Sequence, residues 1–140
     1  MKTVFADTNY WVALVNPQDD LHEKAVKATK DLGGSCHIVT SDMVFAELLN
    51  QFSGYGGNLR SAGVELVKKL SQAGNLTIIP QTRAQFLGAL EMYKDRPDKE
   101  WSLTDCASFL IMQERQILEA LTYDIHFQQA GFKALLRDNG

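Results

Sequence analysis

The sequence predicts an α/β domain in the form of a three-layer α/β/α sandwich, with a central parallel β-sheet of five strands. Short apolar segments that suit buried strands alternate along the chain with longer segments whose apolar residues recur every three or four positions. Strands separated by helices join through right-handed crossovers, which make the strands parallel and place helices on both faces of the sheet. The length of 140 residues fits one domain, residues 1–140.

Five short apolar segments bounded by turn residues are expected to form the strands. They are residues 2–6, 37–40, 76–79, 120–123 and 132–135. The carboxyl ends of parallel strands meet at one edge of the sheet, and ligands bind outside that edge where the strand order reverses. Residues that directly follow the strands are therefore candidates for a functional site.

Amphipathic periodicity and capping residues predict the helices between these strands. Thr82 with Gln85 and Ser102 with Asp105 have the spacing of capping boxes, which mark helix starts. Glycines at 33, 34 and 74 mark helix ends. The expected helices cover residues 10–14, 21–32, 43–52, 59–70, 83–94 and 103–115.

Composition limits the classes of function. Hydrophobic residues make up 45% of the chain and charged residues 22%, as in soluble globular proteins. The first seven residues hold only a three-residue apolar run, so we expect no signal peptide, no membrane span and a cytoplasmic protein. Cys36 and Cys106 are far apart and form no CxxC pair, which argues against a zinc ribbon or a disulfide framework. The net charge of −3 is unfavourable for nucleic-acid binding.

Four acidic residues fall where a parallel sheet would bring them together. Asp7 follows the first strand, Asp124 follows the fourth, Asp105 lies in the first turn of a helix, and Glu47 lies within an apolar helical segment. Each has a structural alternative: Asp7 and Asp105 could cap helices, Asp124 could be a turn residue, and Glu47 could form an ion pair.

Clustered carboxylates without histidine or cysteine ligands suit hard cations that prefer oxygen, such as Mg²⁺ or Mn²⁺. If the four acids are metal ligands, 13 of the 17 acidic residues remain against 14 lysines and arginines. A site with one or two such ions could lower the pKa of a bound water and stabilise charge on a phosphate during in-line attack. The acids therefore indicate phosphoryl chemistry.

Four motifs, in this order, resemble those of the PIN-domain family, and especially of the bacterial VapC-type toxins. They are Ala6-Asp7-Thr8-Asn9, Ala46-Glu47-Leu48, Ser102-Leu103-Thr104-Asp105-Cys106, and the segment from Leu121 to Phe127 followed by Ala130-Gly131-Phe132. The resemblance covers nearly the whole chain.

The resemblance implies a metal-dependent ribonuclease whose acidic residues are Asp7, Glu47, Asp105 and Asp124. It places Asn9, Thr104 and Thr122 where polar side chains would support these acids, and it implies the sheet order 3-2-1-4-5. It further implies an RNA substrate, a product with a 5′-phosphate, an antitoxin partner and a homodimer. The apolar face of residues 59–70 is a candidate for the dimer contact.

Other side chains receive weaker assignments. Lys94, Arg96, Lys99 and Arg60 are candidate phosphate contacts at the rim of the site, although solvated lysines and arginines are common on any surface. The three histidines, His22, His37 and His126, are scattered in the sequence and are expected to have packing or surface roles.

Three other classes of protein also place acidic residues at the ends of parallel strands or share the PIN fold. A haloacid dehalogenase phosphatase would have a second Asp two residues after the first, where this chain has Asn9, and the acidic pair and lysine of a receiver domain have no counterpart. The remaining alternative is a PIN-fold module that binds RNA or protein without efficient cleavage, which the sequence does not exclude.

Overall fold

The computed structural model describes residues 1–137 and contains a five-stranded parallel sheet in the order β3-β2-β1-β4-β5. The predicted fold class and strand order are confirmed. In register, Phe5 of β1 lies opposite Val39 of β2 on one side and Ala120 of β4 on the other. The strands are β1 (Thr3–Ala6), β2 (His37–Ser41), β3 (Leu76–Ile79), β4 (Glu119–Leu121) and β5 (Lys133–Ala134). The expectation of a domain over residues 1–140 includes residues 138–140, which lie outside the described residues.

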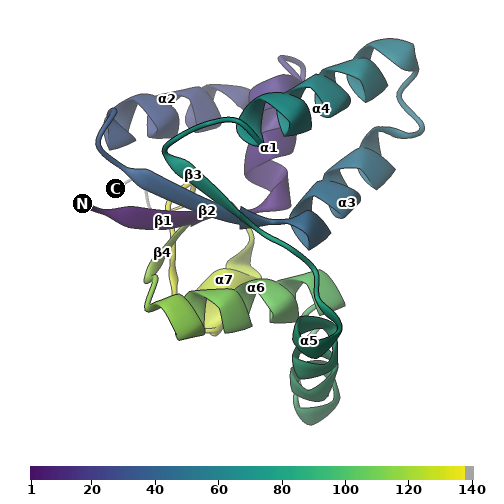
Figure 1. Cartoon of the computed structure of the whole chain (residues 1–140), viewed down its shortest axis with the longest axis vertical. Helices are drawn as coiled ribbons and strands as arrows, with labels where there is room; N and C mark the ends of the chain where they lie inside the picture. Colours follow the sequence, from purple (N-terminus) through teal and green to yellow (C-terminus); the bar gives the residue numbers. More distant parts are fainter. Residues whose placement is uncertain (138–140) are drawn as a thin grey trace.

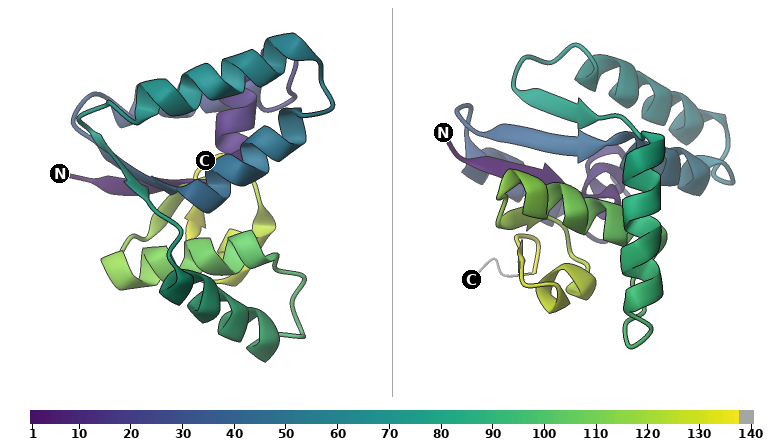
Figure 2. Two further views of the ribbon diagram at one scale, coloured as in Figure 1. Left: turned by 45° about the vertical axis from the view of Figure 1, so that its right-hand side comes forward. Right: turned by 60° about the horizontal axis from the view of Figure 1, so that its bottom comes forward.

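Helices cover both faces of the sheet. Helices α1, α2 and α4 lie on one side and α6 and α7 on the other (Figure 1), while α5 projects away near the carboxyl ends of the strands (Figure 2). No helix among residues 1–137 is long and apolar enough to cross a membrane. The helices are α1 (Thr8–Val15), α2 (His22–Leu32), α3 (Asp42–Phe52), α4 (Gly57–Leu70), α5 (Arg83–Asp95), α6 (Leu103–Arg115) and α7 (Ile125–Gln129).

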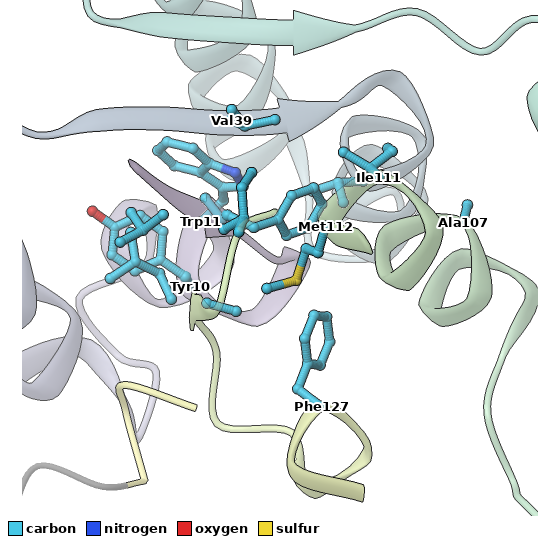
Figure 3. Close-up of a cluster of buried hydrophobic side chains, with 14 of the residues drawn as sticks. Tyr10, Trp11, Val39, Ala107, Ile111, Met112 and Phe127 are labelled. Carbon is cyan, nitrogen blue, oxygen red and sulfur yellow. The ribbon is translucent and has the colours of Figure 1, made fainter. Parts of the chain in front are cut away.

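The core fills the space between the sheet and these two helix layers. Trp11 of α1 and Met112 of α6 are both almost fully buried and approach the sheet region from different helices (Figure 3). Below the sheet, Phe109 and Phe127 pack edge to face with ring centroids 4.9 Å apart. Burial of large aromatic side chains is a major source of folding free energy. Here it holds α6 and α7 in place against the sheet.

Local signals in the sequence set most helix starts. Both predicted capping boxes are present: Thr82 and Ser102 accept from the backbone N–H groups of Gln85 and Asp105, whose side chains bond back to the cap. The Ser41 side chain accepts from Val44 N at 3.2 Å and begins α3 directly after β2. These caps satisfy N–H groups that a helix leaves unpaired at its start.

Two segments differ from the sequence prediction. Strand β4 ends at Leu121, and residues 122–124 leave it as a polar bend into α7, a five-residue helix that the sequence analysis did not predict. Helix α4 begins at Gly57, and Leu59, Leu66 and Leu70 pack against the core. These leucines stay partly exposed and Val64 is 42% exposed, so the suggestion that the apolar face of residues 59–70 forms a dimer contact stays a prediction.

Helices α3 and α4 approach closely at Gly63. A Cβ atom there would lie 3.0 Å from Leu49 Cδ2 and 3.1 Å from Phe52 Cδ2, closer than ordinary contact distance. We expect Gly63→Val to lower the free energy of unfolding by about 1–3 kcal/mol because the core must shift to admit the side chain. Urea unfolding would measure this, with Ser61→Val on the exposed side of the same helix as control. Equal stability of the two variants would contradict close packing at Gly63.

Candidate active site

An open cleft of about 260 Å³ lies at the carboxyl edge of the sheet, outside the ends of β1 and β4. The order of the strands reverses at this point. From β1 the chain adds β2 and β3 on one side, and β4 and β5 then follow on the other side of β1. Among residues 1–137, the side chains around the cleft include five carboxylates and no lysine or arginine. Its lining residues are Asp7, Thr8, Asn9, Glu47, Gln51, Glu100, Ser102, Asp105, Asp124 and His126.

Asp7 lies at the centre of this arrangement and is only 4% exposed. It occupies the N-cap position of α1, yet its side chain makes no cap hydrogen bond, so the simple capping explanation does not account for it. Instead, Thr122 Oγ1 donates to Asp7 Oδ2 at 2.9 Å and Asn9 Nδ2 donates to the same oxygen at 3.3 Å. Asn9 also donates to Thr122 Oγ1 at 3.0 Å, which closes a small polar network beneath the cleft.

Burial raises the pKa of Asp7 from 3.8 to about 7. Removing a carboxylate from water disfavours its charged form, and the negative charges of Asp105 and Glu47 act in the same direction. The hydrogen bonds from the Thr8 backbone and the Thr122 hydroxyl oppose the shift but do not cancel it. Asp7 is therefore a carboxylate that lacks a compensating positive charge among the described residues.

Asp105 enters the cleft from the first turn of α6 and is 7% exposed. Its Oδ2 accepts from Ser102 N at 3.0 Å, as the capping box requires, and from His126 Nδ1 at 2.9 Å. Burial raises its pKa, while the bonds from Ser102 and His126 lower it. The capping alternative is thus correct for Asp105, but the same carboxylate also reaches the cleft.

Asp124 caps the short helix α7 and also reaches the cleft. Its Oδ1 accepts from His126 N at 2.9 Å and lies 3.3 Å from His126 Nδ1. Its own backbone N–H donates to Thr122 Oγ1 at 3.0 Å, which ties it to the network around Asp7. Asp105, Asp124 and His126 each present a ligand atom, and these atoms lie within 4.8 Å of one another.

Glu47 reaches the cleft from the second turn of α3 and is partly buried. Its carboxylate forms no hydrogen bond or ion pair with any of residues 1–137, which rules out an ion pair to a described lysine or arginine. Helix α3 is not buried on all sides, because Ala46 and Gln51 are exposed to solvent. Glu47 thus presents an unpaired carboxylate to a site that already holds other acids.

The structure brings together most of the residues singled out in the sequence. Asp7, Glu47, Asp105, Asp124 and Asn9 line the cleft, and Thr122 lies directly beneath it, fully buried. Thr104 is half-buried, does not line the cleft and makes no side-chain hydrogen bond with residues 1–137. Among the described residues, no hydrogen bond from Thr104 supports the acids as the sequence analysis expected.

The expectation for His126 was wrong, because its ring lies between Asp105 and Asp124 at the cleft. One signal in the sequence could have identified it: His126 comes two residues after Asp124. When an Asp caps a helix, it accepts from the backbone N–H two residues later, which brings that residue's side chain close to the Asp. Glu100, Gln51 and Thr8 were also not identified. They lie in a loop and on two helices that no short motif connects.

The donor set fits a hard divalent cation. It consists mainly of carboxylate oxygens with one imidazole nitrogen, the ligands that suit Mg²⁺ or Mn²⁺ better than the cysteine-rich sets of structural zinc. Thr8 lines the cleft and is 5% exposed, and its buried hydroxyl has no hydrogen-bond partner among residues 1–137. Such an orphaned polar atom is expected where a hydrated ion or a substrate completes the contacts.

The raised pKa of Asp7 predicts how stability depends on pH without divalent metal. Between about pH 4 and pH 7 the folded protein holds a proton on Asp7 that the unfolded chain releases, so the free energy of unfolding falls as pH rises, by up to about 4 kcal/mol. Asp7→Asn removes this contribution. In urea unfolding with EDTA, the variant should therefore gain stability over the wild type from about pH 5 to pH 8. A stability difference that did not change with pH would contradict the assignment.

Comparison with known proteins agrees with this geometry. The 23S rRNA-specific endonuclease VapC20 of Mycobacterium tuberculosis is 29% identical over 134 residues, which span 92% of this chain and 95% of that protein. The crystal structure of VapC20, described as a Sarcin-Ricin loop cleaving toxin, has a TM-score of 0.81 at 24% identity, covering 92% of this chain and 95% of that one.

More distant structures share the fold. VapBC2 from Rickettsia felis, bound to a DNA fragment from its promoter, has a TM-score of 0.66 at 17% identity and covers 94% of this chain and 96% of that chain. FitAcB from Neisseria gonorrhoeae has a TM-score of 0.61 at 19% identity and covers 94% of both chains. The sequence model of the PIN-domain family matches residues 4–133, and the chain therefore belongs to the PIN-domain family.

Proposed function

We propose that this protein is a metal-dependent endoribonuclease that hydrolyses RNA phosphodiester bonds at the cleft. The observation that supports it most directly is the gathering of five carboxylates around one cleft without a lysine or arginine among the described lining residues. Carboxylates placed this close repel one another unless a cation is present, so the arrangement is costly for a protein that only folds. The similarity to VapC20, whose name states endonuclease activity, makes RNA the proposed substrate.

In this proposal Asp7, Glu47, Asp105 and Asp124 hold one or two Mg²⁺ or Mn²⁺ ions. When bound, such ions activate water and stabilise negative charge on a phosphate. Thr122 and Asn9 fix the orientation of Asp7, while Ser102 N and His126 fix Asp105. Glu47, whose carboxylate is unpaired among residues 1–137, is also free to accept a proton from the attacking water.

The biological setting follows from the same similarity. We propose that residues 1–140 act as a single PIN domain and as the toxin of a toxin–antitoxin pair, held inactive in the cytoplasm by an antitoxin protein. A homodimer is proposed as the working form. The partly exposed apolar face of α4 remains the candidate for its contact.

Cleavage of RNA by wild type and Asp7→Asn tests the central claim. With Mg²⁺ or Mn²⁺ we expect the wild type to cleave a panel of single-stranded and structured RNAs, and Asp7→Asn to be at least about 100-fold slower, because the site loses its central anionic ligand. EDTA should abolish wild-type cleavage. Asp42→Asn is the matched control, because Asp42 also follows a strand but is exposed and outside the cleft.

Metal binding can be measured in the same proteins without RNA. Mg²⁺ or Mn²⁺ should raise the melting temperature of the wild type and of Asp42→Asn at about pH 8, and raise that of Asp7→Asn much less. Equal metal stabilisation in all three proteins, or undiminished cleavage by Asp7→Asn, would show that the site is assigned wrongly. A wild type that binds RNA and metal but cleaves no RNA would favour the binding module.

His126 provides a separate test of how the acids are held. We expect His126→Ala to weaken metal binding or activity by about 10–100-fold, because Asp105 and Asp124 lose the ring that lies between them. His37→Ala is the control, since His37 lies at the start of β2 and bonds to Thr77. Isothermal titration with Mn²⁺ and cleavage rates would give the two readouts. Equal losses in both variants would indicate a general effect of histidine removal on the fold.

A further inference from the structure

The acidic cleft leaves open how the protein attracts the polyanionic strand that it is proposed to cut. Two of the four rim cations suggested by the sequence, Lys94 and Arg96, already form ion pairs. The Lys94 ammonium lies 3.0 Å from Glu91, and the Arg96 guanidinium makes two hydrogen bonds to Asp98, at 3.0 and 3.1 Å. Phosphate binding at these positions would have to compete with carboxylates that already neutralise the charge.

A different cluster, adjacent to the cleft along the backbone, carries positive charge that no carboxylate among the described residues neutralises. The ring of Tyr123, which is 38% exposed, has the guanidinium carbon of Arg137 at 4.5 Å from its centroid and the ammonium of Lys24 at 6.0 Å. Arg137 Nη1 also donates to the Tyr123 carbonyl at 2.8 Å. Among residues 1–137, neither cation has a carboxylate within ion-pair distance.

The backbone fixes this cluster to the edge of the cleft. Tyr123 lies between Thr122 and Asp124, and its N–H donates to Asn9 Oδ1 at 3.0 Å. The segment that carries Arg137 is held by a bond from Leu136 N to the Thr122 carbonyl at 3.0 Å. Consecutive Cα atoms are about 3.8 Å apart, so the Tyr123 backbone is within one residue of two members of the site.

The cluster has the chemistry of a phosphate contact. Arginine and lysine bind RNA phosphates, and the aromatic ring restrains both cations by cation–π attraction, so less side-chain freedom is lost on binding. The two charges would attract a strand that the carboxylates alone repel.

We propose that Lys24 and Arg137, held over the ring of Tyr123, form a phosphate-binding site for the RNA strand next to the bond that is cut. Lys24 and Arg137 contact the strand, and Tyr123 acts as a positioning residue through them. This inference rests on the proposed nuclease function, since it concerns the substrate of the same cleft.

The test compares charge-matched double variants. Lys24→Ala/Arg137→Ala removes the cluster, and Lys68→Ala/Lys69→Ala removes two charges from exposed positions of α4 that have no carboxylate within ion-pair distance among residues 1–137. With Mg²⁺ and a mixed-sequence single-stranded RNA, we expect the first variant to raise KM about tenfold with kcat within about twofold, and to reduce the salt slope of kcat/KM by about 1.4 for two lost phosphate contacts. The second variant should behave like the wild type.

Tyr123 and a non-cleaving background complete the design. Tyr123→Phe keeps the ring and should preserve KM, whereas Tyr123→Ala should raise it about threefold. The cluster variants are also made in Asp7→Asn, and binding of the same labelled RNA is measured by fluorescence anisotropy across a salt series. If the wild type cleaves no RNA, the proposed function fails, and this binding experiment alone decides the present inference.

Either of two results would overturn the inference. One is a cluster variant that matches the wild type in KM, in affinity and in salt slope. The other is an equal loss in the Lys68/Lys69 control, which would show that RNA binding depends only on the overall charge. Weaker binding confined to the cluster variant, with Tyr123→Phe unaffected, supports it.

Discussion

The hydrogen bond from Thr122 to Asp7 joins the ends of two neighbouring parallel strands, and the geometry of the cleft depends on it. The Thr122 hydroxyl donates to Asp7 and accepts from Asn9 and from the backbone of Asp124. One buried side chain thereby sets the relative positions of residues from β1, α1 and the bend after β4. Threonine suits this position, because its hydroxyl both donates and accepts hydrogen bonds while the side chain is no larger than that of valine.

The site stores electrostatic free energy that folding has to supply. Asp7 and Asp105 are buried with raised pKa values, and Glu47 faces them without a partner among the described residues. The hydrophobic core around Trp11, Phe109 and Phe127 holds the carboxylates in place against this repulsion. A bound cation would relieve the repulsion, so ion binding and folding stability are linked in a protein of this design.

Much of the fold followed from the sequence because its signals are local. The capping boxes at Thr82 and Ser102 and the strand that ends at Asp7 depend on residues a few positions apart. The cleft was harder to predict, since its members come from distant segments. Asp7 was identified because it follows the first predicted strand, and Thr122 because of the family resemblance. His126 was missed because its role depends on α7, a helix too short to show periodicity.

The sequence separation within the polar network determines when the site can exist. Asp7 and its hydrogen-bond donor Thr122 are 115 residues apart, and Asp124 and His126 come later still. A partly synthesised or proteolytically shortened chain that lacks this segment retains Asp7 and Glu47 but has neither the hydroxyl that orients Asp7 nor the side chains of Asp124 and His126. The assembled cleft therefore requires the chain at least as far as His126, and synthesis of these residues passes through long stages at which the acidic centre cannot form.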